Sequence, residues 1–526
     1  MTDPRDPPAV RARSAEPTGA SAGRWVVTGT GMVASFTMVL SGTIVNVAVP
    51  DVMGTFGVGQ GLAQFLATAY LATMTASQLL GPWITGWLGR RLAFMTVLVV
   101  FAVGGIVCAA SPSIDILILG RVMQGFSAGI VQPLVLTTIL SVFPLERRGM
   151  ATGIYISGLG LALGFGPVVG GLPIDALGWR YIFLVPLPFV AAALVLGAFF
   201  MPDEDGPAQR VRFDWTGYAL LCVSLVCLMS GVANGQRIGW GSDFIAACLG
   251  LGVVTCVLFV RSQLRSERAI LDLSLLANPR FASAIIVMII YGAGNFSITY
   301  ATPVFGQLVQ GLTPTAAGFL LLPAGLVVVV VTPLFGRAAD QLPPAGLITT
   351  GLLLFMCGTL LLSGADGNTP YLHIMLFAVV CRIGMGCITP TLTATAIAAV
   401  PEERLKQGTG TINFFRQLGG AFGINTLVAL LERRTEFHVD AMAATQSADN
   451  AAMRETLSHA RDLLAPSGLP DATYDLIALD HLGRMIAAQA STIAYQDGFL
   501  LVTAVFVVAL LPTWLIGWLD RRSQPA

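Results

Sequence analysis

Charged side chains are scarce in this sequence. Asp, Glu, Lys and Arg make up 11% of its 526 residues, whereas hydrophobic residues make up 55%. Soluble domains carry about 25% charged residues, so water cannot be the only solvent of the folded chain. The 29 basic and 29 acidic residues give a formal net charge of zero. That balance excludes a protein that binds nucleic acid through an overall positive charge.

Patterns for metal, redox and nucleotide chemistry are also missing. The four histidines are scattered, and the eight cysteines lie in long apolar runs without CxxC spacing. Such cysteines are expected to pack as small polarizable side chains rather than to form disulfides or bind metal. No phosphate-binding GxxxxGK[ST] loop occurs. We therefore expect no metal site, no cofactor and no step driven by ATP.

One short motif imitates an enzyme. Residues Gly125 to Gly129 fit GxSxG, the nucleophile motif of hydrolases. That chemistry needs a sharp strand-to-helix turn, whereas this motif lies inside a long apolar run. We therefore predict that the protein is not an enzyme.

Long apolar runs fill most of the chain. A bilayer core takes about 20 mainly apolar residues per helix, and the alternation of a barrel strand is absent, so the runs are expected to be helices. The sequence predicts an all-α integral membrane protein with 14 transmembrane helices. The expected spans are 25–49, 62–83, 92–110, 115–141, 150–172, 181–201, 215–233, 243–261, 282–304, 315–336, 346–364, 371–397, 409–431 and 498–519.

Basic residues indicate the orientation of these spans. With the N-terminus in the cytoplasm, most Arg and Lys residues fall in cytoplasmic segments, and the short outer loops hold only Arg180 and Arg237. This distribution obeys the positive-inside rule, and an odd number of spans would place Arg521 and Arg522 outside. The sequence therefore predicts a multi-pass protein of the inner (plasma) membrane with both termini in the cytoplasm.

An internal repeat divides the chain. Gly129 matches Gly386 and Pro133 matches Pro390 at the same offset (386 − 129 = 257), without gaps. Such matches predict two duplicated halves, as in transporters with parallel repeats, with spans seven and eight inserted between them. The predicted domains are a disordered cytoplasmic tail 1–24, a six-helix bundle 25–201, a linker with two extra helices 202–281, a six-helix bundle 282–519 and a cytoplasmic tail 520–526.

The polar stretch 432–497 interrupts the second bundle on the outer face. Its second half places apolar residues near helical period, for example Leu476, Leu479 and Met485. We expect one or two amphipathic helices on the outer rim, the last of them leading into the final span. A plain solvated loop is the alternative.

The fifth span contains Gly166-Pro167-Val168-Val169-Gly170-Gly171. This GPxxGG pattern resembles the antiporter signature of the major facilitator superfamily, in its branch of fourteen-span drug:proton antiporters. Small residues let helix backbones approach closely, and Pro167 permits a bend. The resemblance implies a major facilitator fold in which Gly166, Pro167, Gly170 and Gly171 lie where two bundles move against each other. Ordinary small-residue packing is the alternative.

Arg121 lies within the fourth span. The run from Arg121 to Gly125 resembles the RxxQG motif of the same family. Because a charged side chain within a membrane is expensive, it normally faces a cavity or a partner. The resemblance implies that Arg121 belongs to the region that couples protons or binds substrate. The alternative is a structural arginine whose N–H groups donate to backbone carbonyls. Arg382 and Arg416 are also deep in their expected spans.

Two motifs depart from the family pattern. The run from Leu40 to Pro50 resembles LDxTIVNVALP, but Ser41 stands in place of the Asp that is a candidate for carrying charge in the membrane. The cytoplasmic signature after the second span is shortened to end in Arg90 and Arg91 and lacks its Asp, whereas its counterpart in the second half keeps Asp340. Arg90, Arg91 and Asp340 are the predicted cytoplasmic gate.

Acidic residues are absent from the middle third of every expected span. A lipophilic cation would need a carboxylate to offset its charge there, so neutral or anionic substrates are expected. Protons would then bind Asp51, another acid at the rim, or the substrate itself. The residues predicted to line the pathway of substrate and protons are Asn46, Arg121, Gln124, Asn295, Arg416 and Gln417.

The resemblance implies a secondary active transporter. It would export drugs or small amphipathic compounds by proton antiport with alternating access. A dedicated exporter of an endogenous anionic metabolite and a membrane sensor that no longer transports are the alternatives. The expected partners are a small-molecule substrate, protons and the lipid bilayer. A periplasmic adaptor with an outer-membrane channel could dock on 432–497.

Overall fold

In the computed structural model, the described residues are 18–202, 213–266, 269–339, 341–401, 404–446, 450–451, 453–455, 458–459 and 471–523. All regular elements within these ranges are helical, as the composition predicts. Asp340 of the predicted gate, most of the N-terminal tail and part of the stretch 432–497 lie outside the described residues.

The first half of the chain forms one helical bundle. Helix α8 packs on α1, α7 packs on both α4 and α6, and α9 closes the bundle against α1 and α6. The elements of this N-terminal half are α1 (Thr18–Ile44), η1 (Val45–Ala48), α2 (Val49–Phe56), α3 (Gln60–Ala63), α4 (Phe65–Ser77), η2 (Gln78–Leu80), α5 (Gly81–Leu88), α6 (Arg90–Ala109), α7 (Ile114–Val142), α8 (Leu145–Leu177), η3 (Trp179–Phe183) and α9 (Leu187–Phe200).

The second half repeats this arrangement. Helix α12 packs on α17 and α19, α16 packs on α14 and α15, and α15 packs on α19. The elements of this C-terminal half are α12 (Pro279–Leu308), α13 (Pro314–Phe319), α14 (Leu322–Ala339), α15 (Pro344–Ser363), α16 (Tyr371–Ala398), α17 (Leu405–Ala443) and α19 (Asp471–Ser523).

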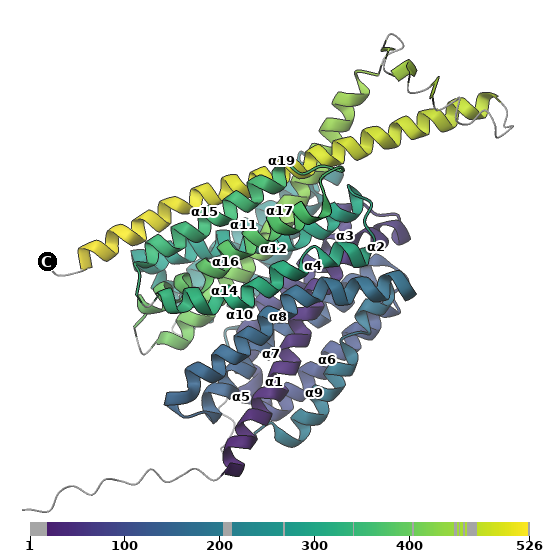
Figure 1. Ribbon diagram of the computed structural model, residues 1–526. Helices are drawn as coiled ribbons and strands as arrows, with labels where there is room; N and C mark the ends of the chain where they lie inside the picture. The colour runs from purple at the N-terminus through teal and green to yellow at the C-terminus, as the bar shows by residue number, and fades with distance from the viewer. Residues whose placement is uncertain are drawn as a thin grey trace, which may run out of the picture.

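The interface between the halves is pseudosymmetric. Helix α8 of the N-terminal half packs on α13 and α14, and α17 of the C-terminal half packs on α4. Each half therefore presses its fifth span against the second span of the other half. In Figure 1 the halves converge at the end that carries α2 and α3 and diverge toward the end that carries both chain ends. We call these ends the distal rim and the termini side.

Thirteen helices in the described residues are long and apolar enough to cross a membrane. The expected span 62–83 is a further helical segment, in which α4, η2 and α5 follow one another without reaching that length singly. The break at η2 precedes Gly81 and Pro82, and proline removes a helical hydrogen bond from the turn before it. The predicted all-α membrane fold is thus confirmed.

The polar stretch 432–497 contains long extensions of two spans. Helix α17 continues to Ala443, and α19 runs without a break from Asp471 to Ser523. Figure 1 shows both extensions projecting beyond the distal rim. The rim helix expected from the pattern of Leu476, Leu479 and Met485 is therefore continuous with the last span and projects outward.

The two extra helices, α10 (Trp215–Ile238) and α11 (Asp243–Arg265), pack on each other, and α10 also contacts α17. Buried Gln263 ties the segments around them together. Its Nε2 donates to Asp214 Oδ2 over 2.8 Å, and its Oε1 accepts from the backbone N–H groups of Ile270 (2.7 Å) and Leu271 (3.2 Å). Asp214 in turn caps α10 by accepting from Gly217 N.

We predict that Gln263→Ala lowers the thermal unfolding temperature of the purified protein. The substitution leaves two backbone N–H groups and a carboxylate oxygen without their partner, at about 1–3 kcal/mol for each buried group. Ser262→Ala, at the neighbouring position of the same helix, is the control and is expected to unfold like the unmodified protein. Equal unfolding temperatures for the two variants would contradict the role of Gln263.

Candidate transport site

Arg121 is fully buried in the N-terminal half. Its Nε donates to the carbonyl oxygen of Leu66 over 2.7 Å, and its Nη1 donates to the carbonyl oxygen of Ser41 over 3.2 Å. Gln124 Oε1 accepts from the same Nη1 over 2.9 Å, and the guanidinium lies 4.3 Å from the centroid of the Tyr70 ring. Arg121 thereby joins α1, α4 and α7.

No described carboxylate forms an ion pair with Arg121. Its Nη2, the Nε2 of Gln124 and both side-chain polar atoms of Gln64 are buried without a hydrogen-bond partner. Backbone carbonyls thus accept hydrogen bonds from Nε and Nη1 of Arg121, as expected if the arginine has a structural role. Its Nη2 group, however, has no hydrogen-bond partner. A positive charge that contacts carbonyl oxygens, a hydroxyl, one side-chain amide and one aromatic ring is suited to a further acceptor or an anion.

Ser41 occupies the position of the family's aspartate and lies directly beside this charge. Its Oγ is 3.3 Å from Arg121 Nη1. A carboxylate at this position would be within ion-pair distance of the guanidinium. With serine at this position, no described carboxylate lies beside Arg121.

A second buried arginine lies in the C-terminal half. Arg382 on α16 donates from Nη1 to Asn295 Oδ1 (2.6 Å) and from Nη2 to Thr299 Oγ1 (2.5 Å). Asn46 of the first half donates to the carbonyl oxygen of Thr299 over 3.3 Å. The predicted residues Asn46 and Asn295 are therefore brought together through Thr299 of α12, at the contact between the halves.

Arg382 and Thr299 are absent from the predicted pathway. The position of Arg382 deep in its expected span was the one feature of the sequence that could have identified it as a site residue. The offset of the repeat places the counterpart of Arg121 at Ala378 (121 + 257 = 378). Arg382 lies about one helical turn after Ala378, so the repeat does not match the two arginines with each other.

The remaining predicted residues lie on α17. Gln417 faces the N-terminal half, where Thr75 Oγ1 donates to its Oε1 over 3.5 Å and its Nε2 donates to Gln78 Oε1 over 3.4 Å. Arg416 is half-buried and donates to Asn413 Oδ1 over 3.3 Å. Gln417 is thus part of the interface between the halves, whereas the described hydrogen bonds do not join Arg416 to the other predicted residues.

The glycines of the antiporter motif Gly166–Gly171 contact both α1 and the opposite half of the molecule. A Cβ built at Gly170 would lie 2.6 Å from Ile44 Cγ1, and one at Gly166 would overlap Thr43 Oγ1, so these glycines pack on α1 within their own half. A Cβ at Gly171 would overlap the Cα of Thr315 in the other half. The carbonyl oxygen of Pro167 lies against Gly318 of α13. The motif therefore joins α8 to α1 and to the opposite half at once.

The arginines of the predicted cytoplasmic gate bond within the N-terminal half. Arg90 Nη1 donates to Ser141 Oγ over 2.9 Å, and Arg91 Nη2 donates to the carbonyl oxygen of Ala198. Their predicted partner Asp340 lies outside the described residues. Both arginines are on the termini side, where α6 begins.

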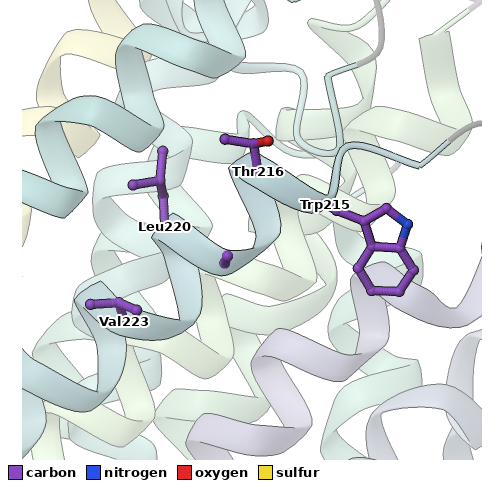
Figure 2. Close-up of a pocket in the computed structure, with 5 residues that line it drawn as sticks. Trp215, Thr216, Leu220 and Val223 are labelled. Carbon is purple, nitrogen blue, oxygen red and sulfur yellow. The ribbon is translucent and has the colours of Figure 1, made fainter.

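A groove of about 410 Å³ lies on α10, and the residues that line it all belong to that helix. Figure 2 shows its lining side chains projecting from one face of that helix. Trp215 and Val223 are exposed there, and the lining is almost wholly apolar. An open apolar groove on an outer helix faces lipid, so it is separate from the polar groups at the interface of the halves.

The fold and the buried polar groups at its centre define a class of protein, the helical transporters made of two similar halves. Residues 31–424 match the model of the Major Facilitator Superfamily, and the chain belongs to that family. This confirms the resemblance carried by GPxxGG and RxxQG. Among the described residues, no group of three or more His, Cys, Asp or Glu side chains is placed to hold a metal ion.

Several known proteins are similar along most of the chain. It is 29% identical over 512 residues to the multidrug resistance protein Stp of Mycobacterium tuberculosis, which covers 95% of this chain and 92% of that protein. It is 28% identical over 407 residues to the multidrug transporter protein MdtP of Bacillus subtilis, covering 77% and 74%. A crystal structure of a POT family transporter in complex with a thioalcohol-conjugated peptide matches with a TM-score of 0.64 at 16% identity, covering 93% and 96%.

We predict that Gly170→Ala impairs transport while leaving membrane insertion intact. The new Cβ would meet the side chain of Ile44 at 2.6 Å, and such overpacking typically costs about 1–3 kcal/mol. The matched control is Gly160→Ala on the same helix, where the nearest atom, Val329 Cγ2, is 3.8 Å away. Efflux per inserted molecule is the measurement, and equal efflux by the two variants would refute the close approach at Gly170.

Proposed function

We propose that this protein is a secondary active exporter of drugs or small amphipathic compounds. It would work in the inner (plasma) membrane with both termini in the cytoplasm. The observation that carries the proposal is that buried polar residues of both halves meet at a pseudosymmetric interface, where Asn46 bonds to Thr299 and Gln417 bonds to Gln78. Membership of the family and the multidrug names of the similar proteins support it.

Alternating access is the proposed mechanism. The halves would rock about their interface, so that the central polar groups open first to one side and then to the other. Close approach of Gly164 to Gly325, where a Cβ on Gly164 would lie 2.7 Å from the Cα of Gly325, provides a contact about which α8 and α14 can pivot. The divergence of the halves toward the termini side (Figure 1) suits a state that is open to the cytoplasm.

The proposed substrates are neutral or anionic. Arg121 and Arg382 are buried and charged, and their described partners are carbonyls, amides, hydroxyls and a ring rather than carboxylates. An anionic group would reduce the electrostatic cost of these buried charges, whereas a cation would increase it. A dedicated exporter of an endogenous anionic metabolite is the second candidate, favoured by the same charges.

Proton antiport remains the proposed source of energy. With no acid in the middle of a span, the proton would bind Asp51, another acid at the distal rim, or the anionic substrate itself. A gate of Arg90, Arg91 and Asp340 would close the termini side in the opposite state. The projecting ends of α17 and α19 (Figure 1) offer a docking surface for a periplasmic adaptor with an outer-membrane channel.

Efflux of a panel of anionic, neutral and cationic dyes from an exporter-deficient bacterium, with and without a protonophore, tests this proposal. We expect protonophore-sensitive efflux of anionic and neutral dyes, and its loss in Arg121→Ala. Efflux that survives the protonophore would contradict antiport. A correctly inserted protein that binds the dyes without moving any of them would instead be a sensor, as the substitution at Ser41 and the shortened gate motif allow.

We predict that Ser41→Asp shifts the substrate preference toward cations. The new carboxylate would lie beside Arg121 and offset its charge, so the ratio of anion to cation export should fall by about tenfold, equivalent to about 1.4 kcal/mol. Ser41→Asn, which has nearly the same size and no charge, is the control and should keep the original ratio. An unchanged ratio in Ser41→Asp would contradict the role of the uncompensated arginine.

A further inference from the structure

Two carboxylates occupy the same place in the two halves. Asp175 lies near the end of α8, and Glu432 lies on α17, with the offset of the internal repeat between them (432 − 175 = 257). Glu432 bonds to Gly61 of α3, and Asp175 interacts electrostatically with Asp51 of α2. Helices α2 and α3 mark the distal rim, where the halves converge (Figure 1). The repeat therefore predicts that whatever one carboxylate contacts has a counterpart at the other.

Asp175 reaches across to the C-terminal half. Its Oδ2 accepts from the backbone N–H of Thr315 over 3.1 Å, in the first turn of α13. One turn earlier on α8, a Cβ on Gly171 would lie 2.6 Å from the carbonyl oxygen of Pro314. The absence of a side chain at Gly171 thus lets the end of α8 approach α13 closely enough for Asp175 to bond.

Glu432 makes the reciprocal contact with the N-terminal half. Its Oε1 accepts from the backbone N–H of Gly61 in α3. A Cβ built at Gly61 would lie 2.7 Å from Oε1 and 2.6 Å from Oε2, so a side chain there would displace the carboxylate. The neighbouring Gln60 donates to the hydroxyls of Tyr495 (3.1 Å) and Tyr300 (3.4 Å), which also belong to the C-terminal half.

Both contacts therefore follow one rule. A carboxylate from the fifth span of one half accepts from an N–H group at the start of the second span of the other half, where helical N–H groups lack partners within their own helix. Hydrogen bonds to ionised acceptors are about twice as strong as neutral ones. Rocking of the halves that opens the distal rim would pull α8 from α13 and α17 from α3, and would break both bonds.

We infer that Asp175 and Glu432 form a pair of latches that hold the distal rim closed and set the balance between the two access states. The inference rests on the proposed alternating access and adds to it two residues outside the predicted pathway. Removal of either carboxylate should raise the population of the state open at the distal rim by roughly tenfold, and removal of both should raise it further.

Distances between spin labels test the latches in the purified full-length protein. Labels introduced as unnatural amino acids keep the eight native cysteines. One pair, at Gly54 and Asn368, spans the distal rim, and a second pair, at Leu92 and Leu342, spans the termini side. Each of these four positions is exposed. The variants to compare are Asp175→Ala, Glu432→Ala and the double variant.

We expect the double variant to lengthen the distance across the distal rim and to shorten the distance across the termini side, with smaller shifts in the single variants. Asp115→Ala and Asp440→Ala are the controls, because these exposed acids lie on helices of the same halves and their side chains make no described bond between halves. Unchanged distances in the double variant would overturn the inference. Lengthening at the distal rim alone would overturn it too, because local loosening does not change the opposite side.

Efflux measured on the same variants separates the two proposals. If distances shift in the latch variants but the unmodified protein moves no substrate, the proposed export function fails and the latches stand. If the unmodified protein exports and the distances of the double variant match its own, the latches fail and the export function stands.

Discussion

The burial of Arg121 is the constraint on which the centre of the molecule depends. A guanidinium removed from water must be met by groups that offset its lost solvation, and here they come from three helices. Ser41 of α1 and Leu66 of α4 supply carbonyl oxygens, while Tyr70 supplies the face of its ring. Displacing any one of these helices would leave the charge less compensated, so the charge fixes how α1, α4 and α7 pack. It also gives the centre a positive potential that no described carboxylate cancels.

The interface between the two repeats is built in a way that suits the proposed alternating access. Glycines bring the halves together backbone to backbone, as at Gly164 and Gly325, and leave few side chains to unpack when the halves move. Polar contacts between the halves include neutral hydrogen bonds, such as those of Asn46 and Gln417, and the bonds of the carboxylates Asp175 and Glu432. Each neutral bond can be exchanged at modest free-energy cost. A close-packed interface with few side chains to separate suits the proposed movement of the halves.

Sequence reasoning recovered the all-α membrane fold because a long apolar run can be recognised from neighbouring residues along the chain. The resemblance at GPxxGG then led to the correct family. What it could not recover depends on packing between distant segments. That Ser41 touches Arg121, 80 residues away, follows only from how α1 crosses α7. In the sequence, Asp175 and Glu432 are acids near the ends of spans with no distinguishing feature. Their contacts with α13 and α3 become evident only in the folded structure. Helices were expected to lie along the rim in the polar stretch, but α17 continues to Ala443 and α19 runs unbroken from Asp471, and both project beyond the rim (Figure 1).

The central claim is that an uncompensated arginine selects what this transporter moves. It is tested most directly in proteoliposomes that contain only the purified protein, with two dyes that share one ring system and differ in a single group, a carboxylate in one and an amine in the other. With the same imposed pH gradient, the account predicts faster transport of the carboxylate dye and loss of that preference in Arg121→Ala. Equal or faster transport of the amine dye by the unmodified protein would contradict it.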